Sequence, residues 1–298
     1  MATDSVFDIV LIGNYTKDTV VSSTGTRMVD GGGFNYGAHV AAMMGLRTAA
    51  VTRLAREDDH VVENLRRLGV TTLPAYTPHS TLLKLFYPTS NVDERVISVT
   101  QTAGSFEPEQ VRHLSARSFL INASTRGEVG LDVVLELRSK PALLAADVQG
   151  FVRVISGDVT LRYDPWPERE EFLAHVDVLK ADAVEAECLT GETDLEAAAR
   201  RIAGWGPTEV VLTHREGLLV LAGGRFHRAF FRPKQLIGRS GRGDTCIASY
   251  VCRRLTSPPD DACHWAAAVT SLKMEAEGPI RRTPAEVEEM MRSGRCSA

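Results

Sequence analysis

The sequence predicts an α/β fold, in which a mostly parallel sheet is sandwiched between helices and carries a small β lid. Short apolar segments alternate with amphipathic segments of helical spacing along most of the 298 residues. Strands that alternate with helices pair in parallel, with helices on both faces. The lid is indicated by residues 81–100, which have the pattern of a hairpin where a helix is expected. We expect one domain over residues 1–298.

The first strand is expected from Val6 to Gly13, an apolar run that a glycine ends. A glycine turn followed by small residues predicts the first helix within 31–45, and Val61 and Leu65 share one face of a second helix at 58–69. Apolar, strand-like runs follow at 48–55, 118–123, 142–148, 209–214 and 217–224. Further helical segments are expected at 128–139, at 197–206, and at 172–181, which runs into a strand.

The last third of the chain, 241–291, is expected to be helical except at 257–261 and 277–284. The hairpin at 81–100 would pair with a segment near 14–30. Together they would form a lid over the carboxyl ends of the main strands, where the ligands of such sheets bind. The alternative is a surface hairpin without that role.

Composition excludes several classes of function. The formal net charge of −4 gives no reason to expect a nucleic-acid partner, which needs a concentrated basic surface. No apolar run reaches the roughly 20 residues of a membrane span, and the amino terminus lacks the basic start of a secretion signal. The cysteines form no C-x-x-C pair, so we expect neither disulfides nor structural zinc, and a reducing cytoplasm. They are Cys188, Cys246, Cys252, Cys263 and Cys296.

The segment "IGRSGRGDTCIASYVCRRL" places glycines directly before a helix. Ile247, Val251 and Leu255 recur at helical spacing, which predicts a helix that starts near residues 242–244. Glycines there leave the first N–H groups of the helix open to an anion. Asp244 lies in this first turn, where an acid is also a good helix-start residue, so a simple cap is the alternative.

Several motifs occur in a fixed order along the chain. They are "GNYTKD", "GGGFNYGAHVAAMMG", "LAREDDHVVENLRRLGV", "KADAVEAECLTG", "GRGDT" and "EGPI". In this order they resemble the signatures of the ribokinase-like (PfkB) carbohydrate kinase family. Gly13 and Asp18 match its early G-x-x-x-x-D element, and Gly31 and Gly32 match its first glycine signature. The resemblance covers nearly the whole chain and implies ATP-dependent phosphorylation of a small polyol.

The resemblance assigns roles around the glycine turn. Asp244 would be the general base that takes the proton of the attacking hydroxyl. The N–H groups of Gly241, Arg242 and Gly243 would stabilise the charge on the phosphoryl oxygens. Arg242 would add a positive charge, or lie solvated on the first turn of the helix.

The polyol would be bound by Asp18 and by the backbone at Gly32 and Gly33. Secondary candidates at strand ends, each of which can equally cap a turn, are Asn14, Asn35, Asp147 and Gln149. In the lid strand, either Lys84 and Phe86 or Leu83 and Leu85 would face the pocket.

The nucleotide would be bound by Lys180, Asp182, Thr213 and Gly217, together with Gly241 and Gly243. Its adenine would rest on the helix at 262–278, whose alanines are equally explained by close packing between helices. Magnesium would be held mainly by phosphates and water. Glu185 would be its outer-shell anchor, with Asp182 as a second candidate, unless they only form the solvated first turn of a helix.

Departures from the family pattern concern the substrate more than the reaction. Tyr36 takes the place of an asparagine, Asp182 also replaces an asparagine, and Arg242 replaces an alanine. With the segment 146–153, these features look more like the inositol-kinase-type branch, which favours a myo-inositol-like cyclitol or a sugar as substrate.

Two other functions compete with this one. A nucleoside kinase would stack its base on Phe34, Tyr36 or Phe86. A catalytically silent regulatory relative would have no reason to retain Asp244. A homodimer formed through the lid is also expected as a possible assembly.

Overall fold

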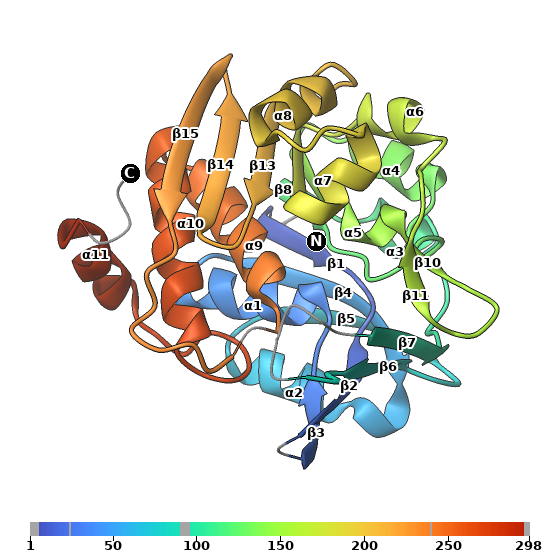
Figure 1. Ribbon diagram of the computed structural model, residues 1–298. Helices are drawn as coiled ribbons and strands as arrows, with labels where there is room; N and C mark the ends of the chain where they lie inside the picture. The colour runs from blue at the N-terminus through green and yellow to red at the C-terminus, as the bar shows by residue number, and fades with distance from the viewer. Residues whose placement is uncertain (1–5, 24, 90–95, 239, 295–298) are drawn as a thin grey trace.

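The computed structural model describes residues 6–23, 25–89, 96–238 and 240–294 (Figure 1). A nine-stranded sheet runs through it in the order β15-β14-β13-β12-β9-β8-β1-β4-β5. The strands from β13 to β5 in this order pair in parallel, and β14 and β15 add an antiparallel edge. Their bounds are β1 Phe7–Ile12, β4 Thr48–Ala55, β5 Thr71–Thr77, β8 Ala116–Ile121, β9 Leu143–Asp147, β12 Val178–Asp182, β13 Glu209–Thr213, β14 Gly217–Ala222 and β15 Arg225–Phe230.

Helices cover both faces of this sheet, so the predicted fold class is confirmed. β1 shows the two faces, because Ile9 and Leu11 belong to one apolar core and Val10 and Ile12 to the other. The first core is completed by α1 Gly33–Met43, α2 His60–Arg67, α9 Arg242–Arg254, α10 Pro259–Met274 and α11 Pro284–Arg292. The second is completed by α3 Glu109–Arg112, α4 Leu131–Arg138, α5 Gln149–Val152, α6 Arg169–Leu173, α7 Ala183–Thr190 and α8 Leu195–Ala203. A 3-10 turn, η1, spans Arg56–Asp58.

A separate four-stranded sheet has the order β3-β2-β6-β7. Its strands are β2 Thr16–Ser22, β3 Gly25–Asp30, β6 Thr81–Phe86 and β7 Val96–Gln101. The two segments expected to form the lid therefore meet in one sheet, with β2 and β6 pairing in parallel at its centre. The link between the two strands of the hairpin expected at 81–100 falls largely on 90–95, outside the described residues.

Local differences from the sequence prediction have physical reasons. The expected break at 257–261 is present but lies earlier, because α9 ends at Arg254 and α10 already starts at Pro259. Proline is well suited to the first helical position, and Asp260 and Asp261 complement the helix dipole. β5 was not predicted, since it contains Pro74; it lies at the edge of the sheet, where proline is tolerated. β15 was not predicted either, and neither was the small hairpin of β10 Arg153–Ile155 and β11 Leu161–Tyr163.

Candidate active site

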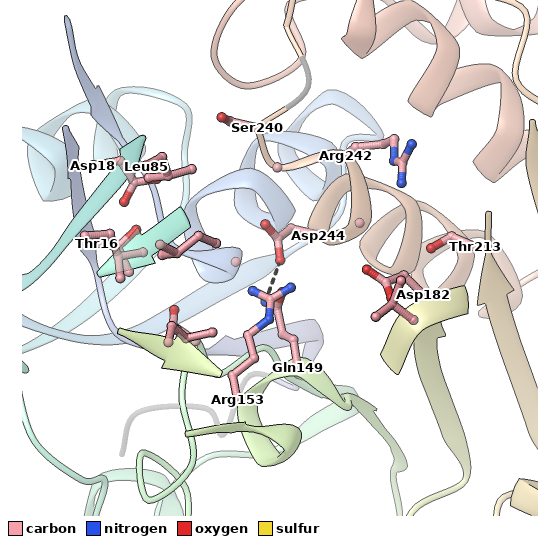
Figure 2. Close-up of a pocket in the computed structure, with 18 of the residues that line it drawn as sticks. Thr16, Asp18, Leu85, Gln149, Arg153, Asp182, Thr213, Ser240, Arg242 and Asp244 are labelled. Carbon is pink, nitrogen blue, oxygen red and sulfur yellow. Dashed lines mark hydrogen bonds between the residues drawn. The ribbon is translucent and has the colours of Figure 1, made fainter. Parts of the chain in front are cut away.

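A cavity of about 690 Å³ opens between the carboxyl ends of the main strands and the four-stranded sheet. This is the edge at which open α/β sheets bind ligands, and the volume suits a small molecule. Figure 2 shows Asp244 near its middle, with Thr16, Asp18 and Leu85 on one side. Arg242, Asp182 and Thr213 lie on the other side. The cavity thus has two ends, which we call the lid end and the helix end.

The helix end is built around the glycine turn before α9. Gly241 is the N-cap residue with φ 73°, in the left-handed region, and a Cβ there would lie 2.3 Å from the ring of Tyr36. A Cβ on Gly243 would lie 2.8 Å from Lys180 Nζ. Among the described residues, no side chain caps this helix. The turn therefore needs its glycines and presents its first N–H groups to the cavity, as an anion site does.

Asp244 is half-buried in the first turn of α9 and lines the cavity. Gln149 Nε2 donates a hydrogen bond to its Oδ1 at 3.1 Å (Figure 2). Burial raises the pKa of this carboxyl, while Lys180 and Arg153 act in the opposite direction. A carboxylate whose pKa is raised, and which one amide orients, is suited to accept a proton near neutral pH.

A group of buried charges lies beneath the cavity. Lys180 Nζ, on β12, is 3.0 Å from Asp147 Oδ2 and 3.5 Å from Glu185 Oε2. Arg153 Nη2 lies 2.8 Å from Glu185 Oε1. Burial raises the pKa of Glu185, but Lys180 and Arg153 outweigh it and hold the pKa at about 2. Glu185 is therefore ionised, and Lys180 and Arg153 stay charged beneath the site that an anion would occupy.

Asp182 and Glu185 also form a capping box at the start of α7. Glu185 N donates to Asp182 Oδ1, and Asp182 N donates to Glu185 Oε2, both at 2.8 Å. Asp182 lines the cavity, whereas the fully buried Glu185 is occupied by its partners beneath it. Among the described residues, no three acidic, histidine or cysteine side chains gather as a metal site. The arrangement fits a magnesium ion held mainly by phosphates and water, and Asp182 is a carboxylate of the helix end that faces the same cavity.

At the lid end, Thr16 and Asp18 project from β2, and Leu83 and Leu85 project from β6. Leu83 and Leu85 are therefore the pair of the lid strand that faces the pocket. Lys84 and Phe86 are exposed and do not line the cavity. Gly32 and Gly33 also line the cavity, and the preceding Gly31 packs against Asp18. Of these side chains, Asp18 carries the only charge, and it is 8% exposed.

Eleven predicted site residues line this cavity: Asp18, Gly32, Gly33, Gln149, Lys180, Asp182, Thr213, Gly241, Arg242, Gly243 and Asp244. Their roles stay predictions. The predicted residues outside the cavity lining are Asn14, Asn35, Asp147, Glu185 and Gly217.

Local bonding accounts for these outer residues. Asn14 donates from its side chain to Gly104 O at 2.8 Å, and Asn35 donates to Asp30 O at 3.2 Å. Gly217 is needed for strand pairing, since a Cβ there would lie 2.1 Å from Ala229 O. These residues shape the backbone around the cavity.

Other lining residues were not singled out from the sequence. Thr16, Arg153, His214, Arg215 and Ser240 all line the cavity. Arg153 and Arg215 each follow a segment predicted to end at the ligand edge of the sheet. Their position after a predicted strand is the feature of the sequence from which both arginines could have been predicted.

Comparison with known proteins identifies the family. Residues 1–286 match the model of the pfkB family of carbohydrate kinases. The chain belongs to this family. The resemblance inferred from the motifs is thereby confirmed, and the protein is a carbohydrate kinase of the PfkB type.

Among relatives of this PfkB kinase, one solved structure is a pyrophosphate-dependent kinase in the ribokinase family, complexed with a pyrophosphate analogue and myo-inositol. It has 34% sequence identity and a TM-score of 0.87, and the match covers 94% of this chain and 99% of that one. A cytidine kinase from Thermococcus kodakarensis is 26% identical over 279 residues, or 87% of this chain and 92% of the relative.

The fold of the PfkB kinase also matches that of Arabidopsis thaliana ribokinase complexed with ribose and ATP. The TM-score is 0.77 at 18% sequence identity, over 97% of this chain and 99% of that one. Within the described residues, no helix has the length and apolarity that crossing a membrane requires.

Proposed function

We propose that this kinase transfers a phosphoryl group from pyrophosphate to a hydroxyl group of a myo-inositol-like cyclitol, with Asp244 as the general base. The single observation that carries the proposal is the charge contrast between the two ends of the cavity. The helix end combines three cations, Lys180, Arg215 and Arg242, with the glycine turn and one carboxylate, Asp182. The lid end has one carboxylate, Asp18, among hydroxyl and apolar groups and no cation from β2 or β6.

The donor is inferred from the helix end. Pyrophosphate is compact and highly charged, so cations and N–H groups supply most of its binding energy. ATP, the donor expected from the family pattern, would also need a surface for its adenine. The helix expected to provide that surface, α10, contributes no residue to the lining of this cavity. The relative that binds a pyrophosphate analogue at 34% identity supports the same donor.

The acceptor is inferred from the lid end. A carboxylate such as that of Asp18 accepts hydrogen bonds from two neighbouring hydroxyls. Leu83 and Leu85 would cover the apolar C–H face of a cyclitol ring. The relative with bound myo-inositol supports this substrate class.

The chemical step then requires little movement. A cyclitol hydroxyl oxygen attacks the nearer phosphorus of pyrophosphate, and its proton passes to Asp244. The bridging P–O bond breaks, and orthophosphate leaves toward Arg215 and Arg242. The N–H groups of Gly241, Arg242 and Gly243 would stabilise the charge on the transferred group. Magnesium, when bound, would neutralise charge on the phosphates, and Asp182 would help to hold it.

A nucleoside kinase is the second candidate, favoured by the 26% identical cytidine kinase and by Tyr87 and Tyr163 in the cavity lining. The residues first considered for stacking fit less well. Phe34 is fully buried in the core, and Phe86 is exposed and does not line the cavity. Tyr36 lines the cavity but is only 2% exposed, because Gly241 packs on its ring.

The test is a matrix of donors and acceptors. Purified protein with magnesium is given pyrophosphate or ATP, and each is combined with myo-inositol, ribose, cytidine or buffer. The proposal expects acceptor-dependent release of orthophosphate with pyrophosphate and myo-inositol. Turnover with ATP and cytidine alone would favour the nucleoside kinase, and no turnover in any combination would favour the silent relative.

The cellular setting remains part of the proposal. The described cysteines, Cys188, Cys246, Cys252 and Cys263, are free, which suits a reducing cytoplasm. β3 and β7 are the outer strands of the lid sheet, and β7 already pairs with Val159 and Thr160 on its outer side. A homodimer through the lid would therefore form along β3.

A further inference from the structure

Lys273, in the last turn of α10, is a cation enclosed by protein. Only 2% of this residue is exposed, and lysine is almost never buried so fully unless it is paired. Burial lowers the pKa of its ammonium group to about 8, although Glu277 and Asp244 act in the opposite direction. No step proposed above uses this lysine, so its burial needs another reason.

The hydrogen-bond partners of Lys273 lie in the segment that leads into the glycine turn. Its Nζ donates to Gly238 O at 3.0 Å and also to Ser240 O. The same Nζ lies 5.5 Å from the ring centroid of Tyr36, within the range of a cation–π contact. One ammonium group therefore joins α10 and α1 to the backbone directly before Gly241.

Other contacts fix both sides of this segment. Ile237 N and Gly238 N donate to Met274 O at 2.9 and 3.1 Å. A Cβ on Gly238 would lie 2.1 Å from Ala276 O, so the backbone presses directly on the end of α10. At the other side, Gly241 rests on the ring of Tyr36. Lys273 bonds to carbonyl groups between these two points.

Backbone carbonyls that converge in a protein interior form a site for a cation. Carbonyl oxygens of this kind can replace the hydration shell of a potassium ion. In this protein the cation is the ammonium group of Lys273, a residue of α10. Removing it would leave two carbonyls turned toward each other in a poorly solvated space, and the turn would relax away from that arrangement.

We propose that Lys273 is a built-in cation that positions the phosphoryl-binding turn through the carbonyls of Gly238 and Ser240, so that no dissolved monovalent cation is needed. The proposal rests on the proposed function in one respect, which is that the reacting phosphoryl group lies at Gly241–Gly243. Lys273 is a positioning residue, because it acts through the backbone of this turn.

The first experiment needs no variant. Turnover of the wild-type enzyme is measured in potassium, sodium, ammonium and tetramethylammonium chloride at equal ionic strength. We expect rates that agree within about twofold, because the cation site is already filled. A wild-type enzyme that requires potassium or ammonium would overturn the proposal.

The second experiment removes the charge. Lys273→Met should lower kcat by about 10²-fold, the effect typical of a displaced catalytic donor, with little change in KM for the polyol. Lys273→Ala should lose similar activity and regain about tenfold when potassium or ammonium ions enter the space. The matched control is Lys234→Met, which removes an exposed lysine from the segment before the same turn and should change neither parameter.

Retention of full kcat by Lys273→Met, or absence of ion rescue in a folded Lys273→Ala, would contradict the proposal. If these variants do not fold, the wild-type ion series decides. Calorimetry with pyrophosphate separates this proposal from the proposed function. Should the wild type bind pyrophosphate but phosphorylate no polyol, the proposed function fails, and Lys273 is then judged by whether Lys273→Met weakens pyrophosphate binding by about tenfold or more.

Discussion

The two ends of the cavity are built from different sheets and carry different charge. The lid end takes Asp18 from β2 and Leu83 and Leu85 from β6, all within the four-stranded sheet. The helix end takes Lys180 and the glycine turn from the main sheet and α9. Asp244 lies between them (Figure 2). In the proposed function this difference separates recognition from chemistry, so that a change in the lid would alter the acceptor without disturbing phosphoryl transfer.

The largest expected effect on activity comes from Asp244, which lies between the lid end and the helix end. Asp244→Asn should lower kcat by about 10³-fold with either substrate pair, because the hydroxyl loses its proton acceptor. Stopped assays for orthophosphate with pyrophosphate and myo-inositol, and for ADP with ATP and cytidine, would measure this. Asp260→Asn is the matched control, since it removes an exposed acid from the first turn of the neighbouring helix α10. Full activity in Asp244→Asn would refute the role of this residue.

A smaller and one-sided effect is expected at each end. Asp18→Asn should raise KM for the cyclitol by about 10- to 100-fold, the value of a charged hydrogen bond, and leave KM for pyrophosphate unchanged. Arg215→Ala should show the reverse pattern with a smaller change, because this arginine is exposed. Steady-state kinetics with each substrate varied in turn would measure both. If each variant changed both KM values equally, the division into two ends would be wrong.

The lid leucines sharpen the comparison further. Leu83→Ser should raise KM for the cyclitol by about three- to tenfold, since it removes apolar contact with one ring face. Phe86→Ser, on the opposite side of the same strand, is the control and should leave KM unchanged. Equal effects from the two variants would show that the strand is destabilised and not that the lid contacts the ring.

The smallest effects concern pH. Activity should fall in acid as the raised pKa of Asp244 is crossed, because a protonated carboxyl accepts no proton. Activity should also fall above the pKa of Lys273, about 8, where the ammonium that faces Asp244, Glu277 and Tyr36 is lost. The effect of Lys273 on the free energy of unfolding has the opposite dependence on pH. Between about 8 and the unfolded value of 10.5 the unfolded chain binds more protons, so this contribution rises with pH.

Rates and thermal unfolding, measured against pH for the wild type and for Lys273→Met, would test both the alkaline loss of activity and the alkaline gain in stability. Lys273→Met should lack the part of the stability that rises with pH as Lys273 loses its proton. An alkaline loss of activity that persists unchanged in the variant would assign that limb to another group.

Much of the helix end could be predicted from the sequence, and less of the lid end. The helix after the glycine turn follows from the spacing of Ile247 and Val251, and the start of α9 places Asp244. The amides of Asn14 and Asn35 bond to local backbone, which their position after a strand or a turn does not reveal. Lys273 meets its partners across more than thirty residues of sequence, so its role required the fold.

The most direct test of the account is ³¹P NMR of a mixture of the protein, magnesium, pyrophosphate and myo-inositol. The account predicts that the pyrophosphate signal is replaced by equal amounts of orthophosphate and an inositol monophosphate, and that Asp244→Asn leaves the pyrophosphate intact. An unchanged pyrophosphate signal, with ATP consumed in a parallel sample that contains cytidine, would contradict both the donor and the acceptor assigned here.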